Sequence, residues 1–280
     1  MEVSKGKQNI RIVFFDIDGT LLKMGETEMT PLMKQALHVL QKNHIKICLA
    51  TGRGMMAIPD FHGIEFDAVL AFNGSYCIAD NQVILKHPLP ETDVHRIIEN
   101  AAEAGRPVSI ATAKEMVANG RDQDLEDYYA IAHEELVVSD KFEEYVQQEV
   151  YQMMLGCDME ERKHILDGTQ HAKLAAWWDR AVDVIPLEGG KGAAIEQVLH
   201  YYRITKEEAV AFGDGANDID MFQAVGTGIA MGNASEEVKA MADEVCGSVQ
   251  EDGIYTWVLQ HIIILEEMMY SALCNGTVFI

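Results

Sequence analysis

The stretch "RIVFFDIDGTLL" at residues 11–22 is the part of the sequence that decides the fold. Its short, continuous apolar run is typical of a strand that is buried on both faces of a parallel sheet. Asp16 and Asp18 follow this run. Residues two apart on a strand share a face, so the two carboxylates repel each other. A hard cation such as Mg²⁺ would relieve the repulsion, whereas a solvated turn would tolerate it. This stretch by itself favours neither interpretation.

Other predicted strands also end in polar residues. The apolar runs 45–50, 67–72 and 209–212 are followed by Thr51, Asn73 and, after one glycine, Asp214. In open α/β sheets, ligands bind beyond the carboxyl ends of the strands, so we expect these residues to meet although they lie far apart in the sequence. Asp214 and Asp218, in "GDGAND", would then complete an oxygen-rich metal site with Asp16.

Helical signals alternate with these strands. Thr30 can cap a helix that has Pro31 in its first turn and apolar residues at helical spacing. Further helices are predicted at 191–202 and 235–242, and a further strand at 228–232. A chain that alternates strands and helices in this way forms right-handed crossovers, so the sequence predicts an α/β fold with a parallel sheet.

The segment 87–186 interrupts this alternation. It follows a predicted hairpin around Asp80-Asn81, opens with "HPLP" and is more polar than its surroundings. Helices are expected near 92–104, 123–135, 142–149 and 159–167, and strands near 107–112, 151–156 and 172–185. We therefore predict an inserted α+β domain at 87–186, with 1–86 and 187–280 forming the core.

Composition narrows the function classes. A net charge of −23 on 280 residues disfavours general binding to nucleic acid or to anionic membranes. The longest apolar stretch, 254–265, is far shorter than the ~20 residues of a membrane span, so we expect a core or amphipathic helix there. The N-terminal residues lack the apolar core of a signal peptide, and five cysteines without a Cys-x-x-Cys pair disfavour a disulfide framework or zinc site. A cytoplasmic protein is expected.

The motifs are weak singly and specific together. Thr51 alone could be a helix N-cap, and Lys191 alone a solvated lysine. In order and spacing, however, "DIDGT" at 16–20, "TGR" at 51–53, Lys191 in "GGKG" and "GDGAND" at 213–218 resemble the motifs of the haloacid dehalogenase superfamily. More narrowly, they resemble its Cof-type phosphatases, which carry a C2 (type IIB) cap where the 87–186 insertion lies. The resemblance covers roughly residues 10–265, although the cap is short and residues 266–280 extend past the expected core.

The resemblance implies a fold, a reaction and a set of residue roles. The fold is a Rossmann-like, doubly wound parallel sheet with an inserted cap. The reaction is Mg²⁺-dependent hydrolysis of phosphate monoesters, in which Asp16 is the nucleophile and Asp18 moves the proton. The metal would be held by Asp16, the Asp18 backbone carbonyl, Asp214 and Asp218. The phosphate would be held by Thr51, Gly52, Lys191 and Asn217. Arg53 and Asn73 would line the substrate side.

The cap should carry specificity, because it closes over the site and contacts the leaving group. We expect one residue of the pair Trp177-Trp178 to pack in the cap core, and Trp178 or Arg180 to contact the substrate. The expected partner is a small phosphorylated metabolite, with sugar phosphates foremost, bound by a monomer or weak homodimer. A phosphomutase on the same scaffold and a non-catalytic binding protein are the alternatives.

Overall fold

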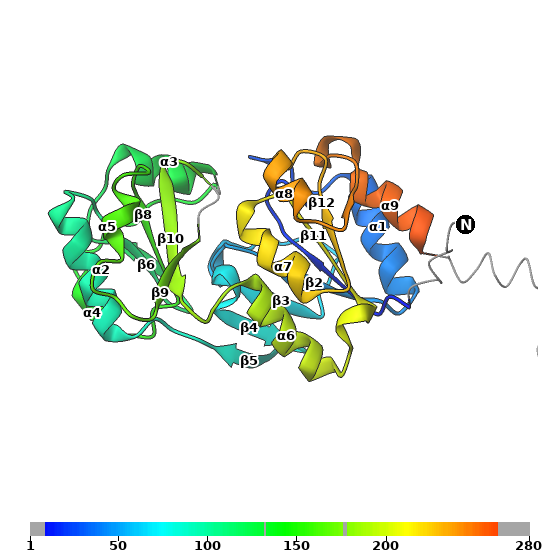
Figure 1. Ribbon diagram of the computed structural model, residues 1–280, viewed down its shortest axis with the longest axis horizontal. Coiled ribbons are helices and arrows are strands. Elements are labelled where there is room, and N and C mark those ends of the chain that lie inside the picture. The colour runs from blue at the N-terminus through cyan, green and yellow to red at the C-terminus, as the bar shows by residue number, and fades with distance from the viewer. Residues whose placement is uncertain (1–8, 132, 176–177, 263–280) are drawn as a thin grey trace, which may run out of the picture.

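The computed structural model of the chain describes residues 9–131, 133–175 and 178–262. Two sheets with their helices lie side by side in the molecule (Figure 1). The larger sheet has the strand order β13-β12-β11-β1-β2-β3-β4-β5, and the smaller sheet has the order β7-β6-β8-β10-β9. The predicted α/β core with an inserted α+β cap is confirmed.

The larger sheet is parallel except at one edge. Its parallel strands are β1 (Ile12–Phe15), β2 (Lys46–Ala50), β3 (Ala68–Ala71), β11 (Ala209–Gly213), β12 (Thr227–Ala230) and β13 (Glu244–Val245). The hairpin β4 (Tyr76–Ala79) and β5 (Gln82–Lys86) adds two antiparallel strands. Strand β1 pairs with β2 on one side and β11 on the other. The chain order reverses there, and the crevice at such a switch point binds ligands.

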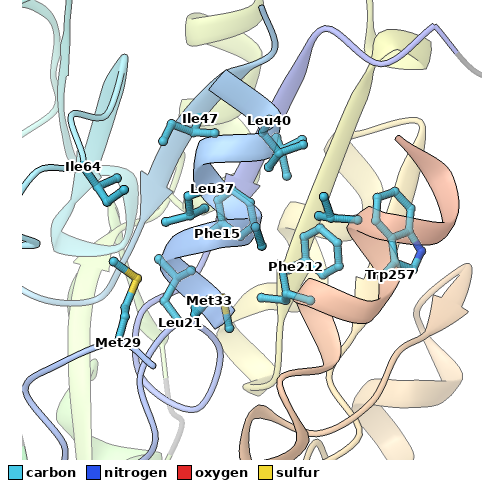
Figure 2. Packing of buried hydrophobic residues seen from close by; sticks show 14 of the residues in the cluster. Phe15, Leu21, Met29, Met33, Leu37, Leu40, Ile47, Ile64, Phe212 and Trp257 are labelled. Carbon is cyan, nitrogen blue, oxygen red and sulfur yellow. The ribbon is translucent and has the colours of Figure 1, made fainter. Parts of the chain in front are cut away.

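Helices cover both faces of this sheet. One face packs against α1 (Pro31–Lys42) and α9 (Gly253–His261), the other against α6 (Lys191–Tyr202), α7 (Ile219–Ala224) and α8 (Glu236–Ala240). Phe15 stacks on Phe212 with 5.4 Å between ring centroids, and Trp257 meets Phe212 edge-on at 5.2 Å (Figure 2). Truncating a buried ring of this kind to alanine costs about 3–5 kcal/mol. This packing fixes β1, and therefore the position of Asp16.

The smaller sheet is antiparallel and belongs to the inserted segment. Its strands are β6 (Ser109–Ala111), β7 (Met116–Ala118), β8 (Gln152–Gly156), β9 (Ala172–Ala175) and β10 (Ala181–Pro186). Its helices are α2 (Glu91–Glu103), α3 (Gln123–Ile131), α4 (Phe142–Val146) and α5 (Arg162–Ile165). A buried cluster joins Tyr151 and α3 of this segment to Phe72 and Tyr76 of the core, so the α3 face of the cap looks toward the core.

Several predictions of secondary structure were wrong. The single strand expected at 172–185 is a hairpin of β9 and β10, because an apolar run does not reveal where a chain leaves the sheet. The helices expected at 123–135, 142–149 and 159–167 are shorter: the described ones are Gln123–Ile131, Phe142–Val146 and Arg162–Ile165, and His133 lies in a turn. The alternation of strands and helices implied a helix between β2 and β3 as well, but that connection contains only the 3₁₀ helix Met55–Ala57, in a stretch broken by glycines and Pro59. Strand β7 was not predicted.

Two further expectations concern membrane-spanning helices and the boundaries of the inserted segment. No helix among the described residues is long and apolar enough to cross a membrane. The apolar stretch 254–265 begins within α9, and its last residues, like Trp177 and the tail 266–280, lie outside the described residues. The division at 86/87 and 186/187 stays a prediction; β5 of the larger sheet ends at Lys86 and β10 of the smaller sheet at Pro186.

Candidate active site

The polar ends of the parallel strands converge at the carboxyl edge of the larger sheet. Asp16 follows β1, Thr51 follows β2, and Asp214 follows β11. Helix α6 begins there with Lys191, whose side chain is fully buried. Residues from four separate parts of the chain therefore meet beside the switch point, as the strand-end rule predicts.

Lys191 is the cationic centre of the site. Its Nζ donates to Asp16 Oδ1 at 2.6 Å and to Asp218 Oδ1 at 2.6 Å. The other oxygen of Asp218 accepts the backbone N–H groups of Asp214 and Gly215, both at 2.9 Å. Burial lowers the pKa of the Lys191 ammonium, but the two carboxylates more than offset this and hold it above its ordinary range. Lys191 is therefore charged and fixed in position.

The carboxylates around Lys191 carry more negative charge than one lysine can balance. Burial raises the pKa of Asp16 well above its ordinary value; Lys191 opposes this rise and the neighbouring aspartates add to it. Burial and Asp218 raise the pKa of Asp214 to about 7, opposed by a hydrogen bond from Thr20. For both carboxyl groups, the positive charge nearby is too small to offset the cost of burying the ionised form.

This cluster fits a divalent cation. Oxygen atoms of Asp16, Asp214 and Asp218 lie within 4.8 Å of one another. Carboxylate oxygens are the ligands that Mg²⁺ prefers, and three carboxylates beside one lysine leave two negative charges for a divalent ion to neutralise. The Asp18 side chain is not part of this cluster. Its assignment to the metal through the backbone carbonyl stays a prediction.

Asp18 has a different partner. Arg53 Nε donates to Asp18 Oδ2 at 2.8 Å and Arg53 Nη2 to Asp18 Oδ1 at 2.7 Å. A third bond, from Arg53 Nη1 to the Ala57 carbonyl at 2.9 Å, holds the guanidinium itself. Such a two-pronged pair fixes both the position and the plane of the carboxylate. Arg53 was predicted to contact the substrate. It lines the cavity between core and cap that is described below, and it also orients Asp18.

Asn73 bonds to residues of both the core and the cap and is not among the residues that line the cavity between them. Its backbone is left-handed, with φ 51°. Its Oδ1 accepts from Asn217 at 3.0 Å, and its Nδ2 donates to Gln152 at 3.1 Å and to Asp183 at 2.9 Å. The side chain predicted to line the substrate side therefore connects Asn217 of the core to β8 and β10 of the cap. Thr51, also predicted for phosphate, is buried and accepts the backbone N–H of Arg53 through its hydroxyl.

Sequence reasoning missed the residues that hold Asp214. Thr20 donates to Asp214 Oδ1 at 3.2 Å, and Asn233 donates to Asp214 Oδ2 at 3.0 Å. Gly19 has φ +81°, and a Cβ there would lie 2.1 Å from Asp214 Oδ2, so only glycine fits. Asn233 follows the carboxyl end of β12, so the strand-end rule could have found it. Gln152 and Asp183 were also missed; each is a polar residue inside a buried strand.

A cavity of about 360 Å³ lies between these core residues and the cap. Core residues in its wall include Asp16, Asp18, Gly52, Arg53 and Asn217, and cap residues are Met116, Tyr128, Tyr129, Ile131, Glu134, Gln152, Met154 and Trp178. Trp178 therefore lies where it was predicted to contact substrate, although in the β9–β10 connection and not on a strand. Arg180 lies behind it, 4.9 Å from its ring centroid, and is paired with Asp124 and Asp127.

Comparison with known proteins places this site in a family. The family model of the haloacid dehalogenase-like hydrolases matches residues 13–258 of the sequence. "Putative phosphatase YkrA" of Bacillus subtilis is 32% identical over 87% of this chain and 95% of its own. "Pyridoxal phosphate phosphatase YbhA" of Escherichia coli is 26% identical over 90% of this chain and 99% of its own. The solved structure of the HAD subclass IIB sugar phosphatase BT4131 has a TM-score of 0.83 at 29% identity, covering 89% of this chain and 98% of that one.

The fold and the matches are those of phosphatases with a capped α/β core. The chain belongs to the haloacid dehalogenase-like hydrolases and, within them, to the Cof-type members. It is a phosphoric monoester hydrolase. The resemblance drawn from the four sequence motifs is thus confirmed.

Proposed function

We propose that this protein is a Mg²⁺-dependent phosphatase of small phosphorylated metabolites that acts through an aspartyl-phosphate on Asp16. The observation that carries the proposal is the pairing of the two acids with different cations. Asp16 bonds to buried Lys191 inside an acidic cluster, while Asp18 is held by Arg53. Both aspartates lie in the wall of one cavity, where a phosphate ester can reach them together.

The chain's own groups suffice to assign each step. An oxygen of Asp16 attacks phosphorus, and the bond from phosphorus to the ester oxygen breaks as Asp18 gives that oxygen a proton. Asp18 then takes a proton from water, whose oxygen attacks the aspartyl-phosphate and releases phosphate and free Asp16. Lys191, the Thr51 hydroxyl and the Asn217 amide would hold the phosphoryl oxygens, whose charge grows in the transition state.

A divalent cation held by Asp16, Asp214 and Asp218 would neutralise charge on the phosphoryl group. The surrounding residues hold these carboxylates in position. Thr20 and Asn233 orient Asp214, and two backbone N–H groups orient Asp218. We infer Mg²⁺ from the all-oxygen donor set and from the small number of carboxylates, which leaves positions for water and phosphate.

The remaining parts of the proposal concern substrate and assembly. The relatives differ in leaving group, since one is named for pyridoxal phosphate and one is titled a sugar phosphatase. Sugar phosphates, which the motifs suggested, are therefore one of two classes to compare. The monomer or weak homodimer expected from the sequence stays a proposal. The buried thiols Cys48 and Cys77 suit a reducing cytoplasm.

The test is phosphate release from a panel of phosphorylated metabolites, with Mg²⁺ and with EDTA. Asp16→Asn should abolish turnover, because an amide cannot form the acyl phosphate. Asp18→Asn should still bind metal but stall, because an amide is neither acid nor base. Wild-type turnover by Asp16→Asn, or in EDTA, would contradict the proposal. Transfer of phosphate to an added sugar, without free phosphate, would indicate a phosphomutase instead.

A further inference from the structure

The cap side of the cavity differs in chemistry from the phosphate side. The core contributes the aspartates, Arg53 and Asn217. The cap contributes mainly apolar and aromatic surface, from Met116, Met154, Ile131, Tyr128 and Trp178, and the core adds Met24 to the wall. A leaving group bound there must be accommodated by carbon, sulfur and π surfaces more than by hydrogen bonds.

The polar groups of the cap wall are already engaged within the protein. Gln152 Nε2 donates to the Gly52 carbonyl at 3.2 Å, and its Oε1 accepts from Asn73. The Tyr128 hydroxyl donates to Asp183, and the Tyr129 hydroxyl bonds to Ser109. Each hydroxyl group of a sugar that is buried here without a partner weakens binding by roughly tenfold. The cap wall is thus poorly suited to a polyol.

The aromatic part of the wall is held rigidly. The rings of Tyr128 and Trp178 lie 6.5 Å apart at an interplanar angle of 37°. On Trp178 lies the Arg180 guanidinium, which Asp124 and Asp127 anchor to α3. Arg180 therefore acts through Trp178 as a positioning residue. A ring already fixed in this way can stack on a planar ligand with little loss of side-chain entropy.

Glu134 is the one charged side chain that the described part of the cap places in the wall. It is partly buried, and burial raises the pKa of its carboxyl group while Arg53 opposes the rise. No basic side chain among the described cap residues lines the cavity. A second anionic group held against the cap would therefore meet a carboxylate and no cation of the described cap, and Arg53 of the core is already bonded to Asp18 and to the Ala57 carbonyl. An N–H donor or a positive charge would find a partner in Glu134.

From the cavity wall, and resting on the phosphatase function proposed above, we propose that the substrate is the phosphate monoester of a planar aromatic or heteroaromatic alcohol. The ring would lie against Trp178, Tyr128 and the methionine side chains. A basic or N–H-bearing substituent would face Glu134. This class takes the place of the sugar phosphates expected from the motifs.

Four esters of primary alcohols test the proposal in the wild-type enzyme with Mg²⁺. They are benzyl phosphate, 4-(aminomethyl)benzyl phosphate, 4-carboxybenzyl phosphate and glucose 6-phosphate, and p-nitrophenyl phosphate reports phosphatase chemistry through its activated leaving group. We expect kcat/KM for benzyl phosphate to exceed that for glucose 6-phosphate by roughly tenfold or more. The aminomethyl ester should be better than benzyl phosphate and the carboxy ester worse.

Two variants assign the charge preference to one carboxylate. Glu134→Gln should reduce the ratio of kcat/KM between the aminomethyl and carboxy esters by roughly tenfold. Glu135→Gln is the matched control, because Glu135 is the next residue, is exposed and does not line the cavity. It should keep the wild-type ratio. Binding of benzylphosphonate, measured by calorimetry, should weaken in Trp178→Leu and supplies a readout independent of turnover.

The outcomes separate this inference from the function on which it rests. If neither p-nitrophenyl phosphate nor any of the four esters is hydrolysed, the proposed function fails and the inference fails with it. If the enzyme is active but glucose 6-phosphate equals or surpasses benzyl phosphate, the aromatic class is overturned and the phosphatase stands. An unchanged ester ratio in Glu134→Gln would overturn the role of that carboxylate.

Discussion

Asp183 offers a sharp test of the electrostatics at the junction of cap and core. It is fully buried in β10, where Oδ2 accepts from Asn73 at 2.9 Å and Oδ1 accepts from Tyr128. Burial raises the pKa of its carboxyl group from 3.8 to about 7, although both hydrogen bonds and the charge of Lys191 oppose the rise. The folded protein therefore keeps a proton on Asp183 in a pH range where the unfolded chain has released it.

The sign of the effect on stability follows from that difference. Between about pH 4 and pH 7 the folded state binds more protons than the unfolded state, so the free energy of unfolding falls as pH rises. A gap of about 3 pH units corresponds to about 4 kcal/mol over the whole range. Between pH 5 and pH 8 the expected loss is about 3 kcal/mol.

Asp183→Asn removes this titration while keeping the size and an acceptor oxygen. Urea unfolding of both proteins in EDTA, at pH 5 and pH 8, gives the comparison. Because Asp16 and Asp214 titrate in both proteins, their contributions cancel in the difference. The free energy of unfolding of the variant, relative to that of the wild type, should rise by about 3 kcal/mol from pH 5 to pH 8. This gain is equivalent to roughly 5 °C in Tm.

The control is Asp179→Asn, an exposed carboxylate in the connection that precedes β10. It should follow the wild-type pH dependence. Parallel pH dependence of Asp183→Asn and the wild type would refute the reasoning, because it would mean that Asp183 is already ionised in the folded protein at pH 5.

Three further predictions concern the core of the site. Lys191→Met should lower the free energy of unfolding in EDTA by roughly 3–5 kcal/mol, because Asp16 and Asp218 lose their shared buried cation; an unchanged urea midpoint would contradict the ion pairs. Gly19→Ala should weaken Mg²⁺ binding, measured by calorimetry, roughly tenfold or more, because its Cβ would displace Asp214. Gly25→Ala, with φ +77° and open space around it, should show similar backbone strain but wild-type affinity; equal losses in both would refute the steric cause. Arg53→Lys keeps the charge but loses the two-pronged grip on Asp18, so kcat should fall by roughly a hundredfold with a smaller change in KM; wild-type kcat would show that Asp18 needs no such orientation.

The fold and the core of the site could be predicted because they rest on local signals. Continuous apolar runs marked β1, β2, β3 and β11, and the polar residue after each run marked the edge where ligands bind. The cap was harder to predict. Its strands are short, and whether Asp183 or Gln152 is exposed or buried depends on contacts with a distant part of the chain.

The direction of a side chain was least predictable. Asn73 occupies the expected place after β3, but its amide bonds to Asn217, Gln152 and Asp183 and does not line the cavity. Arg180 was expected at the substrate, and the acids of α3 hold it behind Trp178. Neither orientation has a signal in the sequence, because each is set by partners on other elements.

The two acids of "DIDGT" show how local geometry turns a repulsive pair into two functions. Strand β1 ends at Phe15, so Asp18 lies in the turn that follows and the strand no longer forces the carboxylates into parallel positions. Asp16 bonds to Lys191, and Asp18 bonds to Arg53. The two acids thus bond to different cations, although Asp16 shares Lys191 with Asp218, and the charge left over belongs to Asp16, Asp214 and Asp218, where a metal would bind. The separation leaves Asp18 in the cavity wall, the position that its proposed role as proton carrier requires.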